Sequence, residues 1–146
     1  ILNKNKTPSN VIEHCKTVCD FAEEVADKLI KKGIKVNKEL VAAAALLHDI
    51  EREKENHVIA GAKLLKSMGF SEVGEVVKKH TLYAIEEPGN QLKTVDEKIV
   101  FYADKRTKGN KIVSLEERFE DLRKRYKKDF SDEFEFTKKI EEELLQ

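Results

Sequence analysis

Several residue types are scarce in this chain of 146 residues, which has no Trp, one Met, two Pro and six Gly. So few helix breakers favour helices joined by short connections. No apolar run approaches the ~20 residues that cross a bilayer. The first ten residues, ILNKNKTPSN, lack the apolar core of a signal peptide. We therefore expect a cytoplasmic protein with no membrane partner.

An excess charge of either sign is also absent, because 28 Lys and Arg residues balance 28 Asp and Glu residues. A general nucleic-acid binder usually carries a basic excess, so none is expected here. The two cysteines, Cys15 and Cys19, are one helical turn apart, and a disulfide within one helix is geometrically unfavourable. We expect reduced thiols, which suits the cytoplasm.

Apolar residues recur every three or four positions, which indicates amphipathic helices. We expect helices over about residues 9–32, 37–50, 57–69 and 71–80. Two capping boxes, Thr94–Glu97 and Ser114–Glu117, open two more. No convincing strand pair is found. The sequence predicts an all-α, single-domain bundle over residues 1–146, of about six to seven helices, with a core at about 10–128 and a C-terminal amphipathic helix at about 131–145.

All four histidines and two aspartates fall on or beside the apolar faces of five successive expected helices: His14, His48, Asp49, His57, His80 and Asp104. A single His on an apolar face is usually a hydrogen-bonded core residue. Six polar groups buried independently would exhaust the net stability of such a domain, about 5–15 kcal/mol. A divalent cation would compensate them together, because neutral imidazole and carboxylate are its ligands.

The ligand atoms of this set are nitrogen and oxygen, which disfavours a structural zinc site built on cysteine. They suit Mn, Fe, Co, Ni, Mg or catalytic Zn, and we expect one or two such ions. A zinc site that combines Cys15 and Cys19 with His14 is less expected, since the spacing lacks a second ligand pair.

Four of these residues stand in a distinctive order: an upstream His14, the doublet His48-Asp49 in LLHDI, and Asp104 in FYADK. This order resembles the HD-domain metal-dependent phosphohydrolases over about residues 10–128. The segments HVIAGAKLL and VKKHT resemble the two-metal branch of that family, which includes diadenosine polyphosphate hydrolases. The resemblance implies two metal ions. The first would be held by His14, His48, Asp49 and Asp104. The second would share Asp49 and also be held by His57 and His80.

Two departures from the family pattern matter for function. Many relatives continue the doublet as Ile-Gly-Lys, whereas this chain has Ile50-Glu51-Arg52. The Gly-Tyr-Pro motif of the cyclic-dinucleotide enzymes is absent, so that substrate is not assigned.

The resemblance implies a metal-dependent phosphohydrolase that uses metal-activated water on a phosphate ester or anhydride of a nucleotide or a similar small phosphorylated molecule. Asp49 is the candidate that orients or deprotonates this water. Lys105 and Arg106 directly follow Asp104, and such cations hold phosphate oxygens. Asp49, Lys105 and Arg106 are therefore the candidate catalytic residues. Lys79 and Arg52, each near a predicted ligand, are weaker candidates for a phosphate contact.

Two other functions stay open. The missing Gly-Lys favours a catalytically silent metal- or nucleotide-binding regulatory module. A di-iron oxygenase of the same fold is less expected, because the cations after Asp104 favour phosphate. Apolar residues near the C-terminus are expected to pack against the bundle or a homodimer partner: Phe119, Leu122, Phe130, Phe134 and Phe136.

Overall fold

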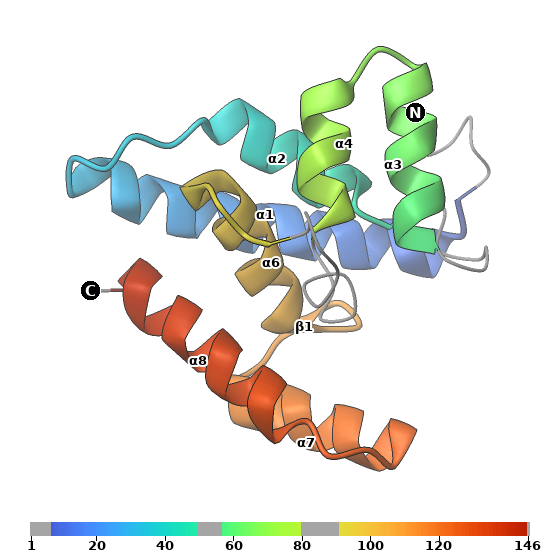
Figure 1. Cartoon of the computed structure of the whole chain (residues 1–146), viewed down its shortest axis with the longest axis vertical. Coiled ribbons are helices and arrows are strands. Elements are labelled where there is room, and N and C mark those ends of the chain that lie inside the picture. The colour runs from blue at the N-terminus through green and yellow to red at the C-terminus, as the bar shows by residue number, and fades with distance from the viewer. Residues whose placement is uncertain (1–6, 50–56, 80–90, 146) are drawn as a thin grey trace.

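The structure is a computed structural model that describes residues 7–49, 57–79 and 91–145, without the side chains of residues 57–59. Within these residues it contains seven α-helices and one short two-stranded sheet (Figure 1). The helices are α1 Ser9–Lys31, α2 Lys38–Leu47, α3 His57–Ser67, α4 Ser71–Lys78, α6 Val95–Lys105, α7 Leu115–Tyr126 and α8 Ser131–Leu145. The expected all-α fold is confirmed. None of the described helices is both long and apolar enough to cross a membrane.

The helix starts follow the capping residues of the sequence. The side chain of Asn37 accepts a hydrogen bond from the backbone N–H of Leu40 at the start of α2. Thr94 and Glu97 form a complete capping box at the start of α6. Side-chain oxygens at these positions satisfy N–H groups that have no partner within the helix.

Helix α2 ends earlier than expected. Its last helical residue is Leu47 in place of about Ile50, so His48 is the C-cap residue and Asp49 lies in the turn that follows. Both side chains therefore project from the point where the backbone leaves the helix.

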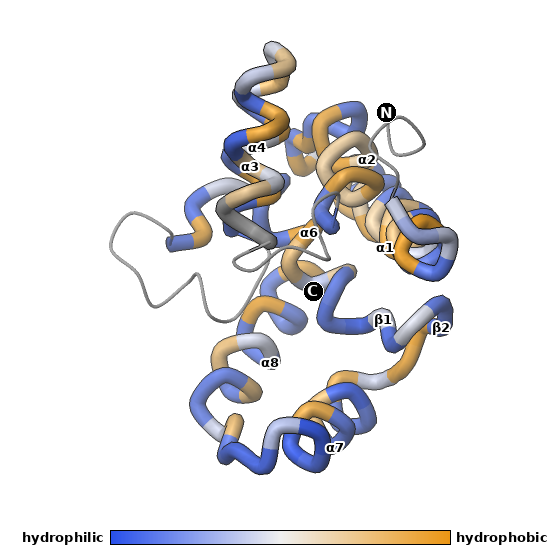
Figure 2. The backbone as a smooth tube through the Cα atoms, turned by 90° about the vertical axis from the view of Figure 1, so that its right-hand side faces the viewer, coloured by the Kyte–Doolittle hydropathy of each residue, from blue (hydrophilic) through white to orange (hydrophobic). Residues whose placement is uncertain are grey.

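Helix α6 lies at the centre of the bundle and packs against α1, α2, α4 and α8 (Figures 1 and 2). Five successive residues of this helix are completely buried, from Ile99 to Ala103. A helix that is apolar on all sides must be enclosed by other elements. The C-terminal end of α6, with Asp104, is therefore held firmly within the fold.

The other helices form pairs around α6. Helices α1 and α2 pack together, and the fully buried Ala44 and Ala45 of α2 belong to the core. Helices α3 and α4 pair at one end of the molecule, and α7 and α8 pair at the other (Figure 1). Small alanine side chains permit the close approach of α1 and α2, which brings residues of both to one point.

A short hairpin follows α6, so the expectation that the chain has no strand pair is wrong. Strand β1 (Thr107–Lys108) pairs antiparallel with β2 (Lys111–Ile112) across the two-residue turn Gly109-Asn110. Gly109 has a φ of 63°, the left-handed region that glycine enters without strain. A two-residue turn with glycine first is a recognised hairpin connection.

The C-terminal aromatic residues pack within the chain. The ring of Phe119 on α7 meets Phe130 and Phe134 edge-on, and Phe136 on α8 meets Phe101 of α6 in the same way. Edge-to-face pairs of this kind stabilise helix packing beyond their buried area. Of the two expected roles for these residues, packing against the bundle is confirmed.

Candidate metal centre

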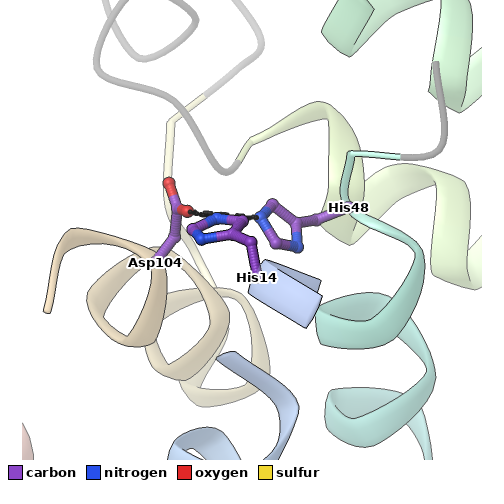
Figure 3. Close-up of side chains that lie close together, drawn as sticks. All are labelled: His14, His48 and Asp104. Atoms are coloured by element: carbon purple, nitrogen blue, oxygen red, sulfur yellow. Dashed lines mark hydrogen bonds and ion pairs between the residues drawn. The ribbon is translucent and has the colours of Figure 1, made fainter. Parts of the chain in front are cut away.

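Three side chains from three helices converge on one point (Figure 3). His14 lies in the second turn of α1, His48 is the C-cap residue of α2, and Asp104 is the penultimate residue of α6. The Nε2 atoms of the two histidines are 3.3 Å apart, and Oδ1 of Asp104 is 3.1 Å from the first and 3.2 Å from the second. These three atoms form a nearly equilateral triangle, which we call the ligand triangle.

The opposite nitrogen of each imidazole is held by a backbone carbonyl. Nδ1 of His14 lies 2.6 Å from the carbonyl oxygen of Gly109, and Nδ1 of His48 lies 2.6 Å from that of Ala45. A carbonyl oxygen carries no proton, so each Nδ1–H must be the donor. An imidazole held in this way that loses its second proton presents the lone pair of Nε2, which is the form that binds a metal.

Asp49 adds a fourth polar group beside the triangle. Its Oδ2 atom lies 3.4 Å from Nε2 of His48 and 3.7 Å from Nε2 of His14, and the residue is buried. The structure therefore brings together four of the six predicted ligands.

The electrostatics of the site favour a cation. Burial disfavours the charged form of His48, yet the charge of Asp49 and the hydrogen bond to Asp104 raise its pKa well above the usual value. Burial likewise opposes ionisation of Asp104, but Lys105 and the two histidines hold its pKa well below the ordinary range. The Asp104 carboxylate thus remains ionised and attracts positive charge.

The donor set fits a divalent ion. Two imidazole nitrogens and one carboxylate oxygen lie only 3.1–3.3 Å apart, and either a shared proton or a divalent ion relieves the repulsion between their lone pairs. Two nitrogens bound to one ion at about 2.0–2.1 Å in a tetrahedral arrangement would be roughly 3.3 Å apart, close to the observed spacing. Nitrogen and oxygen donors are compatible with several divalent metals, so the set does not select one.

Comparison with known families agrees with this geometry, since residues 11–109 match the family described as the HD domain. The chain belongs to the HD domain family. HD domains are generally metal-dependent hydrolases that bind divalent ions. The matched residues contain all four groups of the site, from His14 to Asp104.

Three curated relatives contain a region similar to this chain. An uncharacterized protein of Methanocaldococcus jannaschii is 33% identical over 136 aligned residues, which cover 84% of this chain and 80% of the relative. A tRNA (cytidine(56)-2'-O)-methyltransferase of Picrophilus torridus is 34% identical, covering 99% of this chain and 44% of the relative. The protein of the same name from Thermoplasma volcanium is 31% identical, covering 86% and 40%.

The chain thus spans less than half the length of either methyltransferase. No solved structure matches the chain significantly.

The two predicted phosphate-binding cations lie in different surroundings. The ammonium of Lys105 is buried, 2.8 Å from Oδ2 of Asp104 and 5.3 Å from the ring centre of Phe101. Lys105 therefore lies directly beside the ligand triangle.

The guanidinium of Arg106 is engaged elsewhere. It donates to the hydroxyl of Tyr102 at 2.6 Å and to the carbonyl of Val113, and it stacks over Phe21. A phosphate contact by Arg106 would require it to leave these partners, and that role stays a prediction.

Other predicted residues are only partly placed. Lys79 forms a buried ion pair with Glu97 at 2.7 Å, a structural contact between the end of α4 and α6.

The other predicted residues lie outside the described part of the chain. His57 begins α3, but its side chain is not described, and neither are His80 and the Ile50-Glu51-Arg52 segment. The predicted second metal of the HD site depends on these residues.

Sequence reasoning missed the groups that orient the two histidines. They are the backbone carbonyls of Gly109 and Ala45, which a search for ligand side chains overlooks. The Gly-Asn pair in TKGNKI is a recognisable hairpin signal, so the turn could have been predicted. The contact of this turn with α1 could not have been predicted, because the two segments are far apart in the sequence.

Proposed function

We propose that this HD domain is a metal-dependent phosphohydrolase that cleaves a phosphate ester or anhydride of a nucleotide or a similar small phosphorylated molecule. The observation that carries the proposal is the ligand triangle of His14, His48 and Asp104 with the ammonium of Lys105 beside it. Metal ligands alone would fit many activities. A buried cation next to them favours an anionic substrate.

The residues of the triangle, together with Asp49, would hold the ion. When bound, a divalent ion lowers the pKa of a coordinated water from 15.7 toward about 7 and stabilises charge on a phosphoryl oxygen. Asp49 is a buried carboxylate beside both Nε2 atoms. This position supports the proposed role of Asp49 as a general base, which would accept a proton from the attacking water.

Lys105 would hold a phosphate oxygen while remaining paired with Asp104. An ammonium group has three donors, so it can serve both partners at once. Its burial strengthens the attraction, because charges interact more strongly where water is excluded.

A second ion is part of the proposal. It would be held by His57 and His80 and share Asp49, as in the two-metal branch. Metal analysis of His57→Ala and His80→Ala tests this part: each variant should retain one equivalent of metal where the wild type holds two. Two equivalents in both variants would contradict the two-metal assignment.

The methyltransferase relatives support a second candidate function. Two proteins whose names state a 2'-O-methylation of tRNA contain a region similar to this chain. An HD domain in such proteins could act on phosphates of RNA, or bind RNA or nucleotide without turnover as a regulatory module.

One experiment separates these functions. The purified protein is loaded with Mn²⁺, Fe²⁺, Co²⁺ or Mg²⁺, and phosphate or nucleotide release is measured from mononucleotides, dinucleoside polyphosphates and a short RNA with terminal phosphates. We expect metal-dependent hydrolysis that falls at least about 10²-fold in Asp49→Asn, because this residue is both the proposed general base and a proposed metal ligand. The control is Asp20→Asn, an exposed aspartate on α1.

Tight metal binding without turnover of any of these substrates would overturn the hydrolase proposal. The silent module would then be favoured, and oxygen consumption by the iron-loaded protein would identify the oxygenase. Hydrolysis of the RNA without hydrolysis of the nucleotides would support the second candidate function, action on phosphates of RNA.

A further inference from the structure

The two histidines of the ligand triangle are oriented by different kinds of partner. His48 donates to Ala45, three residues earlier in its own helix, so this bond forms with the end of α2. His14 donates to Gly109, 95 residues away at the tip of the β1–β2 hairpin. Orientation of His14 therefore depends on a separate element of the fold.

A second bond joins the same two elements. The hydroxyl of Thr17, one helical turn after His14, lies 3.3 Å from the carbonyl oxygen of Asn110 and shares its single proton between that oxygen and the carbonyl of Glu13 in its own helix, at 3.1 Å. Both turn residues of the hairpin thus present their carbonyl groups to α1. The hairpin therefore contacts helix α1 through two neighbouring backbone carbonyl groups.

We propose that the β1–β2 hairpin, Thr107–Ile112, is the positioning element of the metal site, and that Gly109 is its key residue. Its carbonyl selects the Nδ1–H tautomer of His14 and fixes the ring with Nε2 toward Asp104 and His48. The inference rests on the proposed metal-binding role of these side chains. Partners that orient metal-ligating histidines in this way typically account for 10–100-fold in metal affinity.

The hairpin is itself tied to the end of α6. The hydroxyl of Thr107 donates to the carbonyl of Ala103 at 2.8 Å, and the N–H of Val113 donates to that of Arg106 at 2.8 Å. The segment from Asp104 to Gly109 therefore supplies one corner of the triangle and orients another. A shift of the hairpin would misplace His14 relative to Asp104.

Gly109 offers a clean way to perturb this contact. Its φ is 63°, and no atom lies within 4 Å of the position that a Cβ would take. A substitution there acts through backbone strain and not through a clash. Valine is strongly disfavoured at such a φ, whereas asparagine is accepted in turns of this kind.

The matched control is Gly33 after the end of α1, where φ is 86° and a Cβ would likewise meet nothing within 4 Å. Gly33→Val imposes comparable strain at the end of α1 that is far from His14.

The experiment measures the dissociation constant for Mn²⁺ by calorimetric titration, the melting temperature, and the ¹⁵N shifts of the His14 ring in the metal-free protein. In Gly109→Val we expect a 10–100-fold weaker affinity and loss of the pure Nδ1–H tautomer. Gly109→Asn should stay within about threefold of the wild type. Gly33→Val should lower the melting temperature without changing the affinity.

Wild-type affinity in a folded Gly109→Val protein would overturn the proposal. So would an equal loss of affinity in Gly33→Val, because the effect would then be general destabilisation. If the wild type binds no Mn²⁺, the metal-binding premise of the proposed function fails. The His14 tautomer still tests the hairpin in that case, and an unchanged tautomer in Gly109→Val would overturn its role.

Discussion

The two oxygens of the Asp104 carboxylate face different partners. Oδ1 lies 3.1–3.2 Å from the two imidazoles, and Oδ2 lies 2.8 Å from the ammonium of Lys105. This division leaves Oδ1 available as a metal ligand while Lys105 holds the group in place. The end of α6 therefore combines a ligand and a cation in successive residues.

The first prediction separates the two adjacent cations. Lys105→Met should lower kcat/KM for a phosphate substrate about 10–100-fold, because a hydrogen bond to a charged group is lost. Arg106→Met should change kcat/KM less than about threefold and instead lower the free energy of unfolding by about 1–3 kcal/mol, since the Tyr102 hydroxyl and the Val113 carbonyl each lose the hydrogen bond from Arg106. Steady-state kinetics and urea unfolding measure both. Equal losses of kcat/KM would instead support the phosphate role of Arg106 that its sequence position suggested.

The second prediction concerns the spacing of α1 and α2. Ala44→Leu should cost about 1–3 kcal/mol of stability, because the alanine is completely buried and extra volume has no room. Metal affinity should fall as well, since His14 and His48 come from these two helices. Ala43→Leu, on the half-buried side of α2, is the control. Unchanged stability and affinity in Ala44→Leu would show that close packing here is not required.

The third prediction uses the buried pair of Glu97 and Lys79. Burial raises the pKa of Glu97, but Lys79 and the backbone N–H groups of Lys93 and Thr94 outweigh it and lower the pKa below 4.5. A lowered folded-state pKa means that this stabilisation is complete above about pH 4.5 and is lost as the pH falls through the folded value.

Glu97→Gln should therefore flatten the acid side of the stability profile, and at pH 7 it should cost about 3 kcal/mol, as for other broken buried pairs. Glu116→Gln removes an exposed partner of Lys138 and should cost at most about 1 kcal/mol. Unfolding free energies measured from pH 3 to 7 test both. Parallel profiles for Glu97→Gln and the wild type would contradict the role given to this pair.

The fourth prediction concerns metal removal. An ion at 100 times its dissociation constant stabilises the folded state by about 2.7 kcal/mol. In a chain of this size that amounts to a rise of about 5–10 °C in the melting temperature. Chelation should reverse the rise, and titration of metal into Asp104→Asn should produce none. A melting temperature independent of metal would show that no ion binds the folded state preferentially.

Much of the fold was predictable because its signals are local. The caps at Asn37, Thr94 and Ser114 are sequence features, and each is confirmed at the start of its helix. The polar set was predictable because histidines on apolar faces need a shared partner, and His14, His48 and Asp104 do converge.

What could not be predicted depends on contacts distant in sequence. Nothing local indicates that the carbonyl of Gly109 meets His14, or that Tyr102 and Val113 occupy the guanidinium of Arg106. The end of α2 at Leu47 was also not apparent, because His48, Asp49 and Ile50 include no Gly or Pro that would end a helix.

The proposed function depends on a divalent ion held by His14, His48 and Asp104, with Asp49. The most direct test is elemental analysis of the metal-loaded protein after desalting, for the wild type, Asp104→Asn and the exposed control Asp20→Asn. We expect at least one tightly bound equivalent in the wild type and the control, and a loss of one equivalent in folded Asp104→Asn. Substoichiometric metal in the wild type, or equal metal in all three proteins, would contradict it.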